Sequence, residues 1–189
     1  MDKEKELVER KMTRLRAFDY SKVGAYFLTI CTDNRREVLS EIVGDDVLGV
    51  PKKNNADAVG KSNLIVPGNV KLLTYGEIAN KYIIQLNDFY ENIHIDAYVI
   101  MPNHIHILMR IGRNGTPRTS SPTRQTSTVS HFISTFKRFC NKDYGANIWQ
   151  RGFYDHIIRC AEDYDEIKKY IYENPLNWYY SAFTEYNSS

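Results

Sequence analysis

The stretch Tyr98-Val-Ile-Met-Pro-Asn-His-Ile-His-Ile-Leu-Met109 decides the fold of this chain. It reads as two apolar strands separated by a break at Pro102 and Asn103, and the second strand carries His104 and His106. Side chains alternate between the two faces of a strand, so both imidazoles are predicted to point the same way. Two neighbouring imidazoles on a rigid element supply part of a site for a divalent metal.

Apolar patterns on both sides of this hairpin predict the other elements. Strands are expected at residues 25–32, 94–102, 104–111 and 154–159, and helices beginning at residues 74, 127 and 162. The order strand, helix, strand, strand, helix, strand predicts an α+β fold, a ferredoxin-like sandwich with one antiparallel sheet and two helices on one face. The extra helix at the end is expected to lie against the sheet, near its central strands.

The ends of two helices are predicted from local signals. Thr74 and Glu77 have the spacing of a capping box, and the apolar face of their helix is expected to extend to Phe89. The last helix is expected to end at Pro175, because the residue before a proline resists helical geometry.

A single domain is expected at residues 23–180, because 189 residues suffice for one hydrophobic core. Residues 1–22 are predicted to be a basic leader and residues 181–189 a short tail. Weak apolar patterning at about 38–73 indicates a hairpin-like insertion with a mobile tip, and the polar segment 112–126 indicates a flexible loop.

Composition limits the class of protein. The hydrophobic fraction of 42% and charged fraction of 25% are typical of a soluble globular protein, and a net charge of +2 does not establish a nucleic-acid partner. Three widely spaced cysteines predict neither a disulfide framework nor a thiolate zinc site. No signal peptide or membrane-spanning run is visible, so a cytoplasmic protein without a membrane partner is expected.

The last predicted helix offers Tyr170 and, four residues later, Asn174, which lie one turn apart on the same face. An amide oxygen is a hard ligand suited to Mg²⁺ or Mn²⁺, and a phenol can form a covalent intermediate. Tyr172 lies about 200° around the helix from Tyr170 and is expected to face away. Together with the imidazole pair, these residues predict a phosphodiester-cleaving site. Taken alone, each of them has a purely structural alternative.

Basic residues provide candidate contacts to a polyanion. Those predicted to contact DNA are Arg14, Arg16, Arg35, Arg36, Lys137, Arg138 and Arg151. Their charge suits phosphate, although a solvated leader or a solvated helix face is the competing interpretation.

Four motifs resemble, in the right order, the single-tyrosine His-hydrophobic-His (HUH) transposases. They are Pro102-Asn-His-Ile-His106, Phe136-Lys137, Trp149-Gln-Arg-Gly-Phe-Tyr-Asp-His156 and Tyr170-Ile-Tyr-Glu-Asn-Pro175. The chain is most similar to the branch of REP-associated tyrosine transposases, whose name refers to repetitive extragenic palindromes. The resemblance implies a ferredoxin-like nuclease that binds hairpin-forming single-stranded DNA, as a monomer or a homodimer.

The resemblance also implies roles for individual residues. His104, His106 and Asn174 would hold Mg²⁺ or Mn²⁺, and Tyr170 would be the nucleophile that forms a 5′-phosphotyrosine intermediate. The insertions at 38–73 and 112–126 are not shared motifs, so substrate recognition there is left open. Two other functions compete: a ferredoxin-like module that binds single strands without cutting them, and a metal hydrolase that uses water and forms no adduct.

Overall fold

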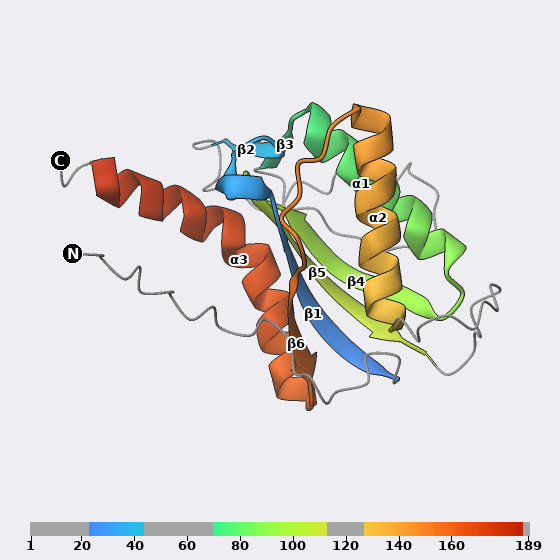
Figure 1. Ribbon diagram of the computed structural model, residues 1–189. Helices are drawn as coiled ribbons and strands as arrows, with labels where there is room; N and C mark the ends of the chain where they lie inside the picture. Colours follow the sequence, from blue (N-terminus) through green and yellow to red (C-terminus); the bar gives the residue numbers. More distant parts are fainter. Residues whose placement is uncertain (1–22, 44–69, 113–126, 187–189) are drawn as a thin grey trace, which may run out of the picture.

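The computed structural model describes residues 23–43, 70–112 and 127–186, with side chains up to residue 181. In this part of the chain, four antiparallel strands form a sheet in the order β4-β5-β1-β6, and a separate pair joins β2 to β3 (Figure 1). The strands are β1 (Gly24–Cys31), β2 (Ser40–Ile42), β3 (Val70–Leu72), β4 (Ile93–Ile100), β5 (His104–Ile111) and β6 (Tyr154–Ile158). The helices are the 3₁₀ turn η1 (Asp33–Arg35), α1 (Thr74–Phe89), α2 (Thr128–Tyr144) and α3 (Ala161–Tyr186). The α+β class, the antiparallel sheet and the ferredoxin-like order are therefore as predicted.

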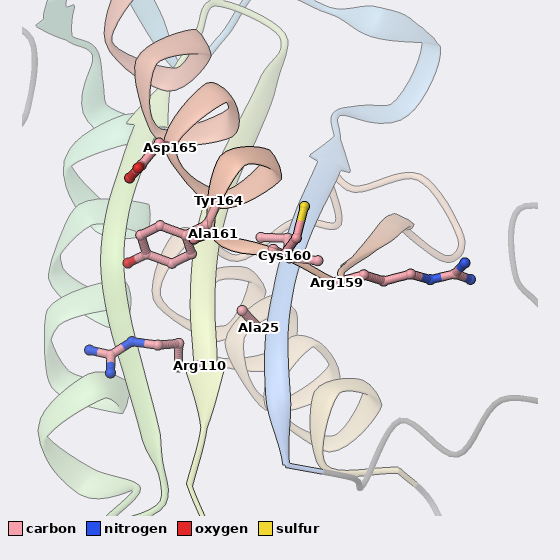
Figure 2. A pocket seen from close by; sticks show the side chains of 8 residues that line it. Ala25, Arg110, Arg159, Cys160, Ala161, Tyr164 and Asp165 are labelled. Carbon is pink, nitrogen blue, oxygen red and sulfur yellow. The ribbon is translucent and has the colours of Figure 1, made fainter.

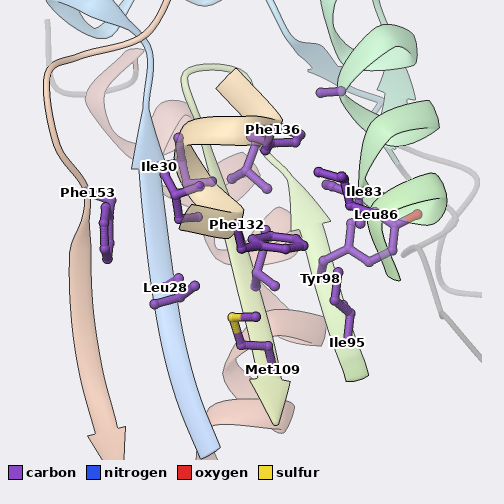
Figure 3. Packing of buried hydrophobic residues seen from close by; sticks show 14 of the residues in the cluster. Leu28, Ile30, Ile83, Leu86, Ile95, Tyr98, Met109, Phe132, Phe136 and Phe153 are labelled. Carbon is purple, nitrogen blue, oxygen red and sulfur yellow. The ribbon is translucent and has the colours of Figure 1, made fainter. Parts of the chain in front are cut away.

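The main core lies between the sheet and the helices α1 and α2, which cover one face together (Figure 3). Alternate residues of each strand point into it, as the two-residue period of a strand requires. Fully or almost fully buried members include Leu28, Ile30, Ile83, Ile105, Phe132 and Phe136. Ser127 caps α2 by accepting a hydrogen bond from the Ser130 backbone N–H at 3.2 Å, and Gly145 ends it in the left-handed region, at φ 80°.

A second, smaller cluster lies on the opposite face of the sheet, beneath α3. Ile171 of α3 is fully buried there against Ala97, Val99 and Leu108 of the sheet, and Ile167 packs beside them. The helix contacts the edge strand β4 and the central strand β5, so it lies against the sheet as predicted, but toward the β4 edge and not over the central strands alone. Burial of this apolar stripe stabilises the position of α3, because a fully buried Ile contributes about 1.5–3 kcal/mol relative to an exposed one.

The two ends of the first insertion, β2 and β3, pair with each other as the strands of a hairpin. Ser40 pairs with Leu72 and Ile42 with Val70 in antiparallel register, which confirms the hairpin-like base predicted at 38–73. Its predicted mobile tip, the loop at 113–126 and the leader at 1–22 all lie outside the described residues.

The predicted start of α1 is wrong in one respect. Thr74 is the first helical residue, so Leu73 takes the N-cap position and no side chain caps the helix. The backbone N–H of Leu73 donates to the Leu39 carbonyl at 2.9 Å, which continues the strand geometry up to the helix. Glu77 therefore lies in the first turn without a partner for a capping box, although its charge is favourable there.

The predicted apolar face of α1 also extends too far, because the last buried residue of the helix is Leu86 and not Phe89. Phe89 is 75% exposed, whereas the next residue, Tyr90, packs against the main core. The helix ends at Phe89, and Tyr90 leaves it with an extended backbone (φ −91°, ψ 106°). This change of direction turns Tyr90 inward and leaves Phe89 on the surface.

The prediction that the last helix ends at Pro175 is wrong. Pro175 lies inside α3, which continues to Tyr186, so residues 181–186 belong to the helix and not to a tail. A proline inside a helix removes one backbone hydrogen bond and costs about 3 kcal/mol. The packing of Ile171 before the proline and of Trp178 after it offsets this cost. In the described part of the chain, no helix is long and apolar enough to cross a membrane.

Candidate active site

The two histidines occupy neighbouring positions on the face of the sheet that α3 covers. In the register of β1 and β5, His104 pairs with Cys31 and His106 pairs with Thr29. Ile105, between them, points into the main core on the other face. This arrangement confirms the prediction that both imidazoles point the same way.

The two imidazole rings converge through their Nε2 atoms, which lie 3.1 Å apart. The Nδ1 atom of His104 is 2.7 Å from Asn103 Oδ1, and that of His106 is 2.9 Å from Thr29 Oγ1. The Asn103 oxygen can only accept, so this contact favours the His104 tautomer with its hydrogen on Nδ1 and a lone pair on Nε2. The Thr29 hydroxyl can donate or accept, so His106 can adopt the same tautomer. Such outer partners fix the orientation of metal-binding imidazoles.

Burial keeps both rings neutral. Burial is the main cause that lowers the pKa of His104 to about 4, and the positive charge of Arg35 lowers it further. Burial also lowers the pKa of His106 to about 3, with further contributions from His104 and Arg35. A neutral imidazole has a lone pair available to a metal at neutral pH, whereas an imidazolium has none.

Tyr170 of α3 stands over this pair in the same chain. Its ring centroid is 5.4 Å from that of His106 and 6.0 Å from that of Phe27, and the residue is 43% exposed. Asn174, one turn later, is buried, at 7% exposed. One turn beyond Asn174, the Trp178 ring centroid is 6.0 Å from that of His104.

The residues present fit a divalent metal. Two nitrogens that bind one ion at about 2.1 Å and at a right angle lie about 3 Å apart, which matches the distance between the two Nε2 atoms. No group of three His, Cys, Asp or Glu side chains suited to a metal occurs in the described residues. A third protein ligand from these residues would therefore have to be of another type, such as an amide.

The basic residues predicted to contact DNA divide into groups. Arg14 and Arg16 lie outside the described residues. Arg35 lies close enough to the imidazole pair to lower both histidine pKa values. Arg138 and Arg151 are exposed, and the Arg138 guanidinium lies 5.2 Å from the centre of the Phe139 ring.

The other two basic residues bond to the protein itself. Arg36 Nε donates to the Asp33 carbonyl at 3.3 Å. Lys137 Nζ donates to the carbonyl oxygens of Gln150 and Gly152, at 2.7 and 2.5 Å. Burial lowers the pKa of Lys137 to about 8. Through these contacts, Lys137 holds the loop before β6 in place.

A pocket of about 580 Å³ lies away from the imidazoles, where β6 leads into α3. Figure 2 shows the ring of Tyr164 and the guanidinium of Arg110 on the same side of this pocket, with Arg159 extending away from them. Arg110 is paired with Asp96 through two hydrogen bonds, of 2.5 and 2.6 Å. The residues that line this pocket include neither the histidines nor Tyr170.

Several residues around the pair were not predicted from the sequence. Thr29 and Asn103 bond to the two Nδ1 atoms, while Phe27 and Trp178 provide aromatic contacts. Asn103 had one visible signal, its place directly before His104 in the hairpin. The contributions of Thr29 and Phe27 depend on the register between β1 and β5, which alternation within one strand does not specify.

Comparisons with known proteins agree with this fold. The sequence model of the family described as "Transposase IS200 like" matches residues 74–174, more than half of the chain. A REP-associated tyrosine transposase of Escherichia coli (strain K12) is 31% identical over 98 residues, which are 47% of this chain and 53% of that protein. The match thus spans about half of that relative.

Two further comparisons cover most of the chain. An uncharacterized protein of Haemophilus influenzae (strain Rd) is 27% identical over 184 residues, which cover 89% of each chain. A solved structure of a REP-associated tyrosine transposase bound to a REP hairpin has a TM-score of 0.54 at 21% identity, covering 88% of this chain and 74% of that one. At this identity the likeness concerns the fold.

Proposed function

Because this chain belongs to the IS200-like transposase family, we propose that it cuts and rejoins single-stranded, hairpin-forming DNA with Tyr170 as the nucleophile. One observation carries the proposal: the half-exposed Tyr170 ring lies 5.4 Å from the ring of His106 within one chain. A phenol that is both reachable from solvent and adjacent to a metal-binding pair meets the two requirements for attack on a phosphodiester.

The proposed metal ligands are His104, His106 and Asn174. The pair offers two neutral nitrogens, and the buried Asn174 lies one turn along α3 from Tyr170 with an amide oxygen as a hard donor. Bound Mg²⁺ or Mn²⁺ would polarise the phosphodiester and offset the charge that develops during attack. Asn103 and Thr29 would keep the two rings oriented.

In the proposed reaction, the Tyr170 oxygen forms a bond to phosphorus while the bond from phosphorus to the 3′ oxygen breaks. The phenol loses its proton to water, and the leaving 3′ oxygen takes one up. The product is a 5′-phosphotyrosine linkage and a free 3′ hydroxyl. Since one phosphoester replaces another, the reverse step can rejoin strands.

Hairpin DNA is the proposed substrate because a relative of the same fold is bound to a REP hairpin. The proposed DNA contacts are Arg14, Arg16, Arg35, Arg138 and Arg151. Arg36 and Lys137 are weaker candidates, because they bond to backbone carbonyls of the protein itself. We propose one domain at residues 23–186, acting in the cytoplasm where chromosomal DNA would be met. The closeness of Tyr170 and His106 within a chain supports a site complete in one subunit, whether or not the protein forms a homodimer.

The test is covalent capture. A hairpin oligonucleotide with single-stranded flanks and a label at its 3′ end is incubated with the protein and Mn²⁺, then separated under denaturing conditions. The label is at the 3′ end because a 5′-phosphotyrosine linkage keeps the protein on the fragment that carries this end. The wild type should give a labelled protein adduct, and Tyr170→Phe should give none. Tyr172→Phe, two positions along α3, is the matched control and should keep the adduct.

Each other outcome has a clear meaning. An adduct that persists in Tyr170→Phe would show that another residue attacks. Cleavage without any adduct would indicate hydrolysis by water. Binding without cleavage by the wild type, at every divalent metal tried, would favour the non-cleaving binding module instead.

A further inference from the structure

A row of side chains crosses the sheet at the level of His106. In the register, Thr29 of β1 pairs with His106 on one side and with Tyr154 of β6 on the other. Directly paired residues project from the same face, so Tyr154 points to the face that carries the imidazoles. The alternation along β6 agrees, because Ile158 packs in the cluster beneath α3 while Ile157 packs in the main core.

Tyr154 is exposed although it belongs to this face. It is 47% exposed, and its side chain makes no hydrogen bond, ion pair or ring contact with the described residues. The strand β6 is at the edge of the four-stranded sheet, so no neighbouring strand covers the ring. Two strand spacings separate Tyr154 from His106, a distance of about 10 Å between backbones.

The backbone that carries Tyr154 is nevertheless held firmly. Lys137 clamps the preceding loop through the carbonyls of Gln150 and Gly152. Gly152 has a φ of 93°, a conformation that favours glycine, and Phe153 is buried in the main core. A side chain that stacks with nucleobases needs a rigid backbone and an open aromatic face. Little conformational entropy is then lost when a nucleobase stacks on the ring.

We propose that Tyr154 stacks against an unpaired base of the DNA strand that lies across the imidazole pair. The proposal rests on the proposed function, since it places the strand at His106 and Tyr170. Stacking accepts any base, because every base has an aromatic face. Tyr154 would therefore select single-stranded over paired DNA at this point without selecting a sequence.

Binding is measured in the Tyr170→Phe background, so that no strand is cut. Fluorescence anisotropy compares a hairpin with single-stranded flanks and the same hairpin with blunt ends. Tyr154→Leu should weaken binding to the flanked hairpin about five- to a hundredfold and leave the blunt hairpin within about twofold. Tyr154→Phe keeps the aromatic face and should bind like the parent.

Phe89→Leu is the matched control, because it removes another exposed ring. It should change neither affinity, and thermal melting should be unchanged in both leucine variants. Equal binding of the flanked hairpin by Tyr154→Leu and its parent overturns the proposal, as does equal weakening on both hairpins. These results leave adduct formation by the wild type untouched, so failure of the stacking proposal is distinguishable from failure of the nuclease assignment.

Discussion

Arg35 and Arg36 are adjacent in the chain but have different surroundings. The charge of Arg35 contributes to the low pKa of both His104 and His106, which makes it a candidate cation for a phosphate held at the imidazole pair. Arg36 instead bonds to the Asp33 carbonyl. The backbone of Arg35 has a φ of 54°, uncommon for a residue other than glycine, and such conformations cluster at functional sites.

We expect Arg35→Gln to slow adduct formation more than Arg36→Gln does. Loss of a cation beside the reacting phosphate should lower the rate about tenfold or more, whereas Arg36→Gln should change it only a few-fold. The measurement is the initial rate of adduct formation at saturating hairpin DNA. Equal rates for the two variants would contradict this division of roles.

At the scale of elements, the contact between α1 and the hairpin base depends on Gly76. A Cβ atom at this position would overlap with the backbone carbonyl of Leu39 and come within 3.3 Å of Leu72 Cδ2. Backbone cannot move aside as a flexible side chain can, so even one methyl group must displace the helix.

Gly76→Ala should therefore lower the free energy of unfolding by about 1–3 kcal/mol. Chemical denaturation of both proteins under the same conditions measures this difference. Gly112→Ala is the control, because the nearest atom to its Cβ would be the Asn92 carbonyl oxygen at 3.9 Å, an ordinary contact. Equal stability of the two variants would show that α1 is not packed tightly against the Leu39 carbonyl at Gly76.

At the scale of the whole molecule, the neutral histidines link stability to pH. Their folded-state pKa values, about 4 and about 3, lie below the ordinary value of 6.5, so the unfolded chain binds protons that the folded chain does not. Stability then rises with pH through this range and is lost as pH falls below about 6.5. Each histidine contributes a slope of at most about 1.4 kcal/mol per pH unit.

We expect the free energy of unfolding to fall by about 2–4 kcal/mol between pH 7 and pH 5, measured by urea denaturation in a chelator. The double variant His104→Gln/His106→Gln should show a flatter profile, since glutamine does not titrate. An unchanged slope in the double variant would assign the pH dependence to other groups. Added Mn²⁺ should stabilise the wild type at pH 7 and not the double variant, because only the folded wild type presents both imidazoles.

The sequence by itself determined what depends on short-range periodicity. The alternation of Ile and His from residue 104 placed both imidazoles on one face of β5, and the helical spacing in α2 identified its buried side. The order of these elements left few possible folds, because connections are short and a sheet must bury at least one face. The same helical period predicted that Tyr170 and Asn174 lie one turn apart on the same face of the last helix.

Only the tertiary structure decided how these elements meet. The register of β1 against β5 and β6 brings Thr29 between His106 and Tyr154, although Thr29 and Tyr154 are far apart in the chain. The helix α3 runs through Pro175 because burial of side chains on either side outweighs the local preference to stop. Local preferences are worth up to about 1 kcal/mol for most residues and about 3 kcal/mol for a proline inside a helix. The contacts that override them join segments distant in sequence, and they form only when those segments fold together.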